Sequence, residues 1–173
     1  MKKVLVGFLG LSLSVVALGI GTNGWAGEVT STPVPTVIDE RYEVLNDGTE
    51  IRDLKTTLIW QRCSVGTTWE DTRCTGPSKE LTFNEAQAIA NNGWRVPTKE
   101  ELTTLIEKNP KGRQINQKAF PSSEGWFWTS DTPEMDSQVA FFINFFNGYT
   151  FAANKASANH VYLVRGNGVK YAN

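Results

Sequence analysis

The sequence predicts an α+β domain with antiparallel sheets, and three observations carry this prediction. Short segments rich in β-branched and aromatic residues occur at 42–61 and again at 126–165. Two amphipathic helical segments lie between them, at 82–93 and 98–106. Because strands and helices do not alternate along the chain, the pattern excludes the β-α-β units of a parallel sheet.

Both predicted helices begin with a capping box, in which a threonine and a glutamate three residues later satisfy each other's backbone donors. Thr82 and Glu85 form the first box, and Thr98 and Glu101 form the second. Behind each box, apolar residues recur at helical spacing and predict one buried stripe per helix. The stripes are Ala86, Ile89 and Ala90 in the first helix and Leu102, Leu105 and Ile106 in the second.

The stretch 93–102 joins the two helices. Gly93 has no Cβ and suits the left-handed position just after a helix, so we expect it to end the first helix. Pro97 disfavours the α-helical region for the residue before it, which predicts an extended segment up to the Thr98 cap. We interpret Trp94 and Arg95 as structural, and we expect Arg95 to pair with an internal carboxylate or with carbonyl groups.

The first strand-rich region predicts a meander that enters the core. Residues 42–45 form a short strand, an Asn-Asp-Gly turn follows, and 49–52 return. The apolar run 57–61 then predicts a further strand, which buries Trp60 and leads into Cys63.

In the second region, Trp128 belongs to a predicted strand at 126–130, and a longer strand is expected at 139–146. The side chains of the longer strand alternate between its two faces. Its four phenylalanines therefore divide into Phe141 with Phe145 and Phe142 with Phe146. One face belongs to the core. We expect loops to cover the other, although it would otherwise form a platform for a glycan or a partner.

The dipeptide Asn147-Gly148 is typical of a two-residue type I′ hairpin turn. It predicts that the strand 139–146 returns directly as a second strand at 149–153. The segment 160–165 is expected to close the sheet.

The N-terminus indicates export. A basic start, an apolar run from Val4 to Ile20 and small residues at 24 and 26 predict a signal peptide over 1–26. Residues 27–40 are rich in Thr and Pro and are expected to form a linker or extended arm. The domain is expected over 41–168, with a tail at 169–173. We therefore expect a secreted, periplasmic or cell-surface protein without a stable membrane span after cleavage.

The net charge argues against one class of partner. The formal charge of the chain is −1, and removal of Lys2 and Lys3 with the signal peptide makes it −3. A general nucleic-acid-binding protein is normally basic overall, so nucleic acid is not expected as a partner.

Cys63 and Cys74 are the only cysteines. In an oxidising compartment, a pair eleven residues apart predicts a structural disulfide, which stabilises by roughly 3 kcal/mol in the chain-entropy model. The loop between them contains no histidine, which disfavours a metal site. We expect Trp69, inside this loop, to pack the loop against the body.

Several ordered motifs resemble the family of the Lcl adhesin C-terminal domain, formerly a domain of unknown function. The resemblance covers about residues 41–166. The motifs are Asp53-x-x-Thr56-x-Leu58-x-Trp60-Gln61-Arg62-Cys63, Gly66-x-x-Trp69, Cys74-x-Gly76, Gly93-Trp94-Arg95-Val96-Pro97-Thr98-x-x-Glu101-Leu102, Phe120-Pro121, Phe127-Trp128-Thr129-Ser130 and Val164-Arg165.

This resemblance implies a C-type-lectin-like fold, with two helices, antiparallel sheet and a long loop region that carries binding. It also implies adhesion to glycosaminoglycans. The Trp-Arg-x-Pro-Thr-x-x-Glu segment is similar to a piece of formylglycine-generating enzyme-like domains. Those enzymes use cysteine and metal chemistry near their C-terminus, and this chain has no cysteine after Cys74.

Catalysis is not expected. His160 is the only histidine, so a nucleophile–histidine set would have to include it, and nothing near it in sequence resembles a nucleophile elbow. Carboxylate pairs for hydrolysis remain a remote alternative.

Three groups of polar and charged residues are candidate sites. Lys108, Lys111 and Arg113 place three cations in a short loop and predict contact with a sulfated or carboxylated polysaccharide. Asp131, Glu134 and Asp136 offer oxygen ligands for calcium in one loop, and Asn46, Asp47 and Glu50 form a looser second group. Neither acidic group matches the sugar-and-calcium signatures of true C-type lectins, and a solvated surface loop is the ordinary explanation.

The sequence therefore predicts an exported, non-catalytic binding or adhesion module that needs no cofactor, unless calcium binds at one of the acidic groups. The expected partner is an extracellular polysaccharide, with anionic glycans as the first candidates. The alternative is a surface protein, with this chain as an accessory of an appendage or envelope complex.

Overall fold

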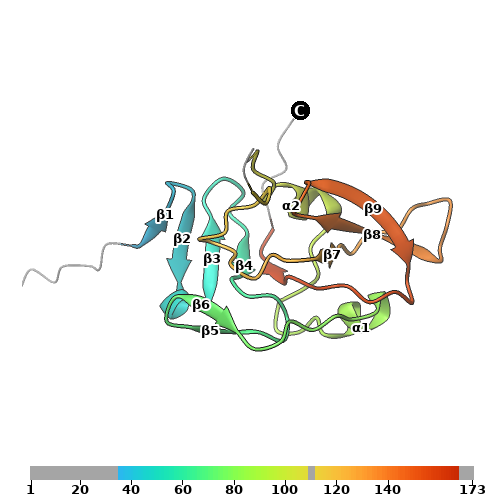
Figure 1. Ribbon diagram of the computed structural model, residues 1–173, viewed down its shortest axis with the longest axis horizontal. Helices are drawn as coiled ribbons and strands as arrows, with labels where there is room; N and C mark the ends of the chain where they lie inside the picture. Colours follow the sequence, from blue (N-terminus) through green and yellow to red (C-terminus); the bar gives the residue numbers. More distant parts are fainter. Residues whose placement is uncertain (1–34, 109–111, 168–173) are drawn as a thin grey trace, which may run out of the picture. The chain divides into compact units, whose positions relative to one another are not determined.

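The computed structural model describes residues 35–108 and 112–167, all of which belong to one compact unit (Figure 1). The expected signal peptide, most of the expected linker and the expected tail lie outside the described residues. None of the helices in the described ranges is long and apolar enough to cross a membrane.

Two short helices lie between strand-rich regions in the chain, and every ladder is antiparallel, so the α+β prediction is confirmed. The strands are β1 (Val37–Ile38), β2 (Tyr42–Leu45), β3 (Glu50–Asp53), β4 (Ile59–Gln61), β5 (Thr68–Glu70), β6 (Arg73–Thr75), β7 (Trp126–Trp128), β8 (Val139–Asn144), β9 (Tyr149–Asn154) and β10 (Val164–Arg165). The helices are α1 (Phe83–Ala88), α2 (Lys99–Thr103) and the short 3-10 helix η1 (Asn46–Gly48).

The strands form a five-stranded sheet in the order β1-β2-β3-β4-β10, a three-stranded sheet in the order β7-β8-β9 and the β5-β6 hairpin. In the larger sheet, β10 pairs with β4 through Val164 opposite Trp60. The predicted final segment therefore closes a sheet, but it joins the larger sheet beside β4 and not the sheet of β8 and β9. Only 164–165 form the strand, whereas His160 makes an isolated bridge to Phe127.

The two helices contact opposite faces of the three-stranded sheet. Phe83 of α1 packs edge-to-face on Trp128, with 5.9 Å between ring centroids. Lys99 of α2 lies on the other face, with its Nζ 4.9 Å from the Phe141 ring centre. Adjacent residues of a strand point to opposite faces. Strands β7 and β8 therefore contribute side chains to two core clusters, one on each face of their sheet.

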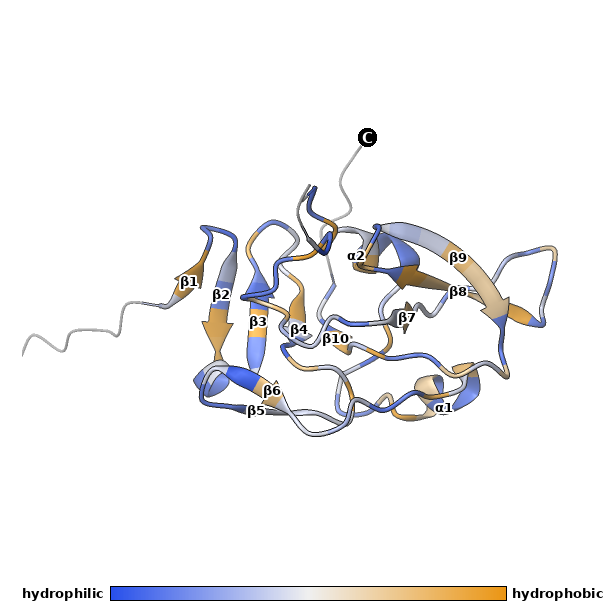
Figure 2. Cartoon of the chain, in the orientation of Figure 1, coloured by the Kyte–Doolittle hydropathy of each residue, from blue (hydrophilic) through white to orange (hydrophobic). Residues whose placement is uncertain are grey.

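The cores on the two sides are distinct. One cluster joins the five-stranded sheet, α2 and one face of β7 and β8; it includes Tyr42, Ile51, Leu58, Trp60, Leu102, Leu105, Phe120, Phe127, Ile143, Phe145 and Tyr162. The other lies under α1 and includes Phe83, Ala86, Val96, Trp128, Ala140, Phe142, Val161 and Leu163. Figure 2 shows β8 as largely hydrophobic, whereas β9 beside it is pale.

The expected disulfide is present between Cys63 and Cys74, whose Cα atoms are 5.6 Å apart. Trp69 packs its loop against the body, also as expected. The guanidinium of Arg62 lies 3.7 Å from the centre of the Trp69 ring. A Cβ at Gly48 would clash with Nε1 of Trp69, so only glycine leaves room for the indole.

Both capping boxes form as predicted. The second box also provides the carboxylate that Arg95 was expected to find: both Glu101 oxygens accept from the Arg95 guanidinium at 2.6 Å, and Glu101 accepts from the Thr98 N–H at 2.8 Å. The backbone of Arg95 also bridges Val164 of β10. The stretch 93–102 thus fastens the start of α2 to the edge of the larger sheet.

Gly93 does not end the first helix, contrary to the prediction. Helix α1 stops at Ala88 with Ile89 as its cap, well before the glycine. Gly93 has φ +82°, and Asn92 before it has φ +48°. Together they form a tight turn closed by the Trp94 N–H donating to the Asn91 carbonyl. The prediction that Gly93 adopts positive φ is confirmed. The reason is different, because the residue lies in a turn and not at the end of a helix.

The type I′ turn predicted at Asn147-Gly148 is also wrong. Asn144 pairs with Tyr149, so four residues, 145–148, form the loop. Gly148 has positive φ but Asn147 does not, whereas a type I′ turn needs it at both central residues. The loop includes Phe145, which turns into the core, and Phe146, which is exposed. These two residues therefore fall outside the alternation of β8.

The domain begins earlier than expected at its N-terminal side. Residues 37 and 38, assigned to the linker from sequence, form β1 and pair with Glu43 and Tyr42 of β2. Asp39 then accepts hydrogen bonds from Asn116 and Lys118, each at 2.9 Å. The arm is therefore part of the sheet from residue 37 onward.

Candidate ligand-binding surfaces

A buried ionic network links the larger sheet to α2 and has a structural role. Asp53 is fully buried and accepts two bonds from the Arg41 guanidinium, at 3.0 and 2.8 Å. Thr56 Oγ1 donates to the same carboxylate at 2.9 Å, which explains the Asp-x-x-Thr spacing. Burial by itself raises the pKa of Asp53, but the bonds and charge of Arg41 outweigh it and the pKa is lowered.

The same arginine reaches the segment after α2. Arg41 Nη1 and the Tyr42 hydroxyl both donate to Glu107, at 3.2 and 3.1 Å. Burial of the Tyr42 ring raises the pKa of its hydroxyl, so this hydroxyl stays protonated and donates. Each charged group of this network is paired inside it, which gives the network a structural role.

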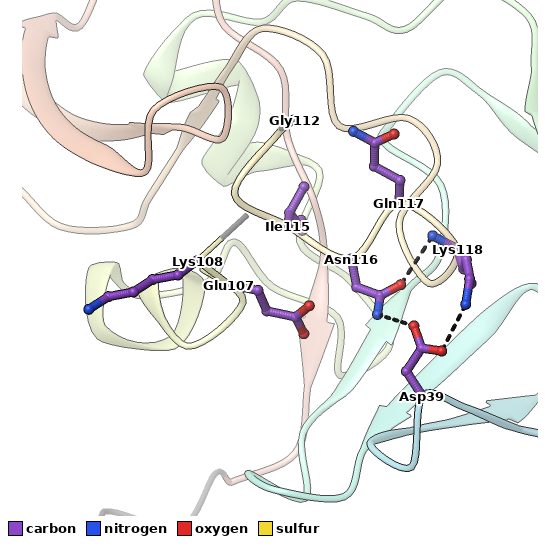
Figure 3. A pocket seen from close by; sticks show the side chains of 8 residues that line it. All are labelled: Asp39, Glu107, Lys108, Gly112, Ile115, Asn116, Gln117 and Lys118. Carbon is purple, nitrogen blue, oxygen red and sulfur yellow. Dashed lines mark hydrogen bonds and ion pairs between the residues drawn. The ribbon is translucent and has the colours of Figure 1, made fainter. Parts of the chain in front are cut away.

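The predicted basic loop borders a surface depression of about 480 Å³. Figure 3 shows its lining residues, which are Asp39, Glu107, Lys108, Gly112, Ile115, Asn116, Gln117 and Lys118. Lys108 extends away from the others, whereas Lys118 is held by Asp39. The depression therefore combines acidic with basic groups, and its net character is not strongly positive.

Arg113 does not project freely toward solvent, as the basic-loop prediction required. Its guanidinium forms an ion pair with Glu124. Lys111 lies outside the described residues, and Lys108 is exposed. Of the three predicted cations, the structure therefore presents Lys108 to solvent and partly neutralises Arg113.

The three carboxylates of the predicted acidic loop do not come together. Asp131 Oδ2 accepts from the backbone N–H of Lys99 at the start of α2, and Asp136 accepts from the N–H of Gln138. These carboxylates are turned toward different backbone donors and do not converge with Glu134. Within the ranges that the structure describes, no group of three histidine, cysteine or acidic residues could hold a metal ion.

The looser acidic group around η1 does not converge either. Glu50 lies on β3 and forms a 2.6 Å ion pair with Arg165 of β10. The Asn46 carbonyl accepts from Thr49, which closes η1, and Asp47 sits in that turn with positive φ. The carboxylate of Glu50 therefore links two strands of the sheet.

His160 connects the disulfide loop to the three-stranded sheet. Its Nδ1 lies 2.8 Å from Ser78 Oγ, which in turn lies 2.8 Å from Ser64 Oγ. The ring packs against Gly125, where a Cβ would come within 2.5 Å of it. Glu80 approaches Nε2 at 3.6 Å. The arrangement fixes the segment that follows Cys74, which sequence alone did not indicate.

Four aromatic side chains form a partly exposed row across the three-stranded sheet, which we name the aromatic strip: Trp126, Phe142, Phe151 and Tyr149. They share one face, because Trp126 stands opposite Asn144 and Phe142 stands opposite Phe151. Neighbouring rings lie 5.5, 5.7 and 6.3 Å apart along the row. Trp126 is 53 % exposed, Tyr149 65 % and Phe151 45 %.

Helix α1 covers only one end of this face. Its Phe83 packs on Trp128, and Ala140 and Ala153 lie in or against the same cluster. Beyond them Phe142 is still buried, whereas Trp126, Phe151 and Tyr149 are exposed. The expectation that both faces of the long strand are covered holds for β8, which has no exposed residue. The exposed rings of the strip belong to β7 and β9, on either side of it.

The open end of the strip adjoins the predicted basic loop. The Gln114 N–H donates to the Phe145 carbonyl at 2.6 Å, and its side chain lies beside Gly148 in the β8–β9 loop. Arg113, one residue earlier, pairs with Glu124 just before β7. The acidic loop 131–138 lies at the opposite end of these strands, where the Phe141 N–H donates to the Asp131 carbonyl (Figure 1).

Sequence reasoning missed the strip because its members come from three strands. Aromatic residues at 149 and 151 do alternate with small ones, which is a signal for one exposed or half-buried face. Only the register of β7, β8 and β9 places them beside Trp126.

These observations define a small disulfide-linked α+β domain with an uncovered aromatic row on its smaller sheet. The chain belongs to the family of the Lcl C-terminal domain, which matches residues 49–165. No curated protein and no solved structure matches the chain. The matched range begins after β2, so β1, β2 and Arg41 precede it.

Proposed function

We infer that this protein is an exported, non-catalytic binding or adhesion module that recognises anionic polysaccharides such as glycosaminoglycans, on a C-type-lectin-like fold. Membership of the Lcl C-terminal domain family supports this function. The disulfide supports export, because such bonds persist in oxidising compartments. The observation that carries the proposal is the aromatic strip.

Exposed aromatic rows of this kind are uncommon on soluble monomers and mark interaction sites. Flat aromatic rings suit the apolar faces of sugar rings, and Trp126 and Tyr149 offer such faces at the open end of the strip. Charge recognition would come from the neighbouring loop. Lys108 is exposed there, and Arg113 would exchange Glu124 for a sulfate or carboxylate of the ligand.

A single polysaccharide chain would contact both features. Its sugar rings would stack on the strip, and its anionic groups would reach the cations beyond the β8–β9 loop. A surface protein remains the alternative partner, since an apolar strip also suits a protein interface.

The test measures heparin binding by the full exported chain and by Trp126→Ala with Tyr149→Ala. We expect affinity to fall at least about tenfold, which corresponds to about 1.4 kcal/mol. Met135→Ala is the matched control, because Met135 is 99 % exposed but lies in the loop at the other end of the sheet. It should bind like the unaltered chain.

A second arm tests the charges with Lys108→Gln and Arg113→Gln together, against Lys79→Gln as an exposed cation elsewhere. The basic-loop variant should weaken binding more in low salt than in high salt, because ionic contacts are screened. Unchanged heparin affinity in the aromatic variant would contradict the proposed site.

A further inference from the structure

The strands at the edges of the sheets differ in whether their outward backbone groups are hydrogen-bonded. The outer edge of β7 is covered, since the Trp128 N–H donates to the His160 carbonyl and the His160 N–H to the Trp126 carbonyl. The outer edge of β10 is covered by Arg95, which exchanges both backbone bonds with Val164 at 2.9 Å. Strand β1 contains only two residues. Proteins commonly protect sheet edges in these ways, by covering them or keeping them short.

Strand β9 has none of these protections. It is six residues long, and five of the six are exposed. It is the outer strand of its sheet, after β8. Its sequence Tyr-Thr-Phe-Ala-Ala-Asn contains no charge and no proline, the residues that usually block pairing at an edge.

The backbone direction of each β9 residue follows from the ladder. The backbone N–H of Phe141 donates to the Asp131 carbonyl, and its carbonyl accepts from the Thr129 N–H, so the backbone groups of Phe141 point toward β7. Backbone groups alternate in direction along a strand, and those of Ala140 and Phe142 therefore point toward β9. Their partners there are Ala153 and Phe151.

The N–H and C=O groups of Thr150 and Ala152 therefore point outward, away from β8. Among the described residues, none bonds these outward groups. Asn154 also points outward, but its carbonyl already accepts from the Ser157 N–H at 2.8 Å.

We propose that β9 pairs antiparallel with β9 of a second copy of this chain, so that the two three-stranded sheets join into one. Thr150 of each copy stands opposite Ala152 of the other, and these pairs exchange their outward N–H···O=C bonds. Phe151 then lies opposite Phe151 of the second copy, a favourable aromatic cross-strand pair.

Two observations favour a second copy of this chain as the partner of β9. The strand is uncharged, so antiparallel pairing with itself opposes no like charges. The alternative register, with Ala152 opposite Ala152, would require the Asn154 carbonyl that Ser157 already uses. A two-fold axis at Phe151 satisfies the free groups of both copies equally, as a symmetric dimer requires. The proposal rests on this edge alone and does not depend on the polysaccharide.

The experiment is sedimentation of the full exported chain, disulfide intact and without ligand, over a wide concentration range. We expect a reversible dimer. The double variant Thr150→Lys with Ala152→Lys places lysine opposite lysine twice, and should weaken association at least about tenfold. The matched variant Thr150→Glu with Ala152→Lys changes the same exposed positions but places glutamate opposite lysine, and should retain the dimer.

Amide hydrogen exchange gives the second readout. The amides of Thr150 and Ala152 should exchange slowly in the dimer and fast at dilutions where the chain is monomeric. A chain that stays monomeric at every concentration would overturn the proposal, as would equal dimerisation of the two double variants. Slow exchange of these amides in a monomer would also overturn it, because another segment of the same chain would then cover the edge.

Discussion

The two main sheets of this protein use charge in opposite ways. The five-stranded sheet holds ion pairs across its strands and at its margins: Arg41 with Asp53, Arg52 with Glu43, and Arg165 with Glu50. The three-stranded sheet contains no charged residue in β7, β8 or β9. Its outer strand is exposed and aromatic, whereas the charged groups of the larger sheet are paired internally.

The difference separates structural from recognition surfaces. A carboxylate that is buried and bonded by an arginine stabilises the domain but offers nothing to a ligand. An uncharged edge strand beside an exposed aromatic row leaves backbone groups without hydrogen-bond partners and apolar surface in contact with water. Such surfaces are typical of interaction sites. Substitutions in the two sheets should therefore separate stability from binding.

Among the substitutions of charged residues, the largest expected effect comes from Asp53→Asn. Removing this charge leaves the Arg41 guanidinium, whose side chain is only 18 % exposed, without its main partner. We expect a loss of about 3 kcal/mol in the free energy of unfolding, measured by urea denaturation. The control is Glu124→Gln, which removes an exposed partner of Arg113 and should change stability by less than about 0.5 kcal/mol. Similar losses in both variants would remove the contrast between buried and surface pairs.

A smaller effect is expected from Glu101→Gln, and it depends on pH. Burial raises the pKa of Glu101, but the Arg95 hydrogen bond and the Thr98 N–H outweigh it, so the pKa lies below its ordinary 4.5. The ion pair therefore stabilises the fold at pH values above 4.5, and this contribution is lost as the pH falls through the lowered pKa.

The glutamine introduced by this substitution keeps the capping box but carries no charge. We therefore expect a loss of about 1 kcal/mol at neutral pH that shrinks on acidification. Thermal melts of the variant and the unaltered chain across the acidic range measure this convergence. If the melting temperatures of the two proteins differed by the same amount at every pH, the charge of Glu101 would not contribute to stability.

The smallest effect on stability is expected for Tyr149→Ser in the aromatic strip. This side chain is 65 % exposed, so its removal should change the free energy of unfolding by less than about 0.5 kcal/mol. Phe127→Ala, in the same sheet but fully buried, should cost about 3–5 kcal/mol. A large loss for Tyr149→Ser in chemical denaturation would mean that the strip is part of the core and not a binding surface.

Features governed by local spacing were predictable from the sequence. Each Thr-x-x-Glu motif is complete within four residues, so both caps formed where they were expected. The expected disulfide formed as well. The partner of Arg95 was anticipated only as an internal carboxylate, and it is Glu101 of the same motif.

Features that depend on distant segments were not predictable. In the sequence Arg113 resembles a free cation, and only the fold brings Glu124 to it. Asp131 resembles a metal ligand, and only the fold places the Lys99 N–H beside it. The hairpin after β8 takes four loop residues because Phe145 is drawn into the core, which the dipeptide Asn147-Gly148 could not reveal.

The sequence by itself determined the class of the fold, its two helix starts, the disulfide and the resemblance to its family. These features depend on hydrophobic periodicity, on helix capping and on the order of motifs, all of which can be read along the chain without knowing which segments meet. Only the tertiary structure decided which charges are neutralised, that four aromatic residues from three strands form one strip, and that β9 keeps an open edge. Those outcomes depend on strand register and on which segment lies beside which, and they are fixed by packing across the whole chain.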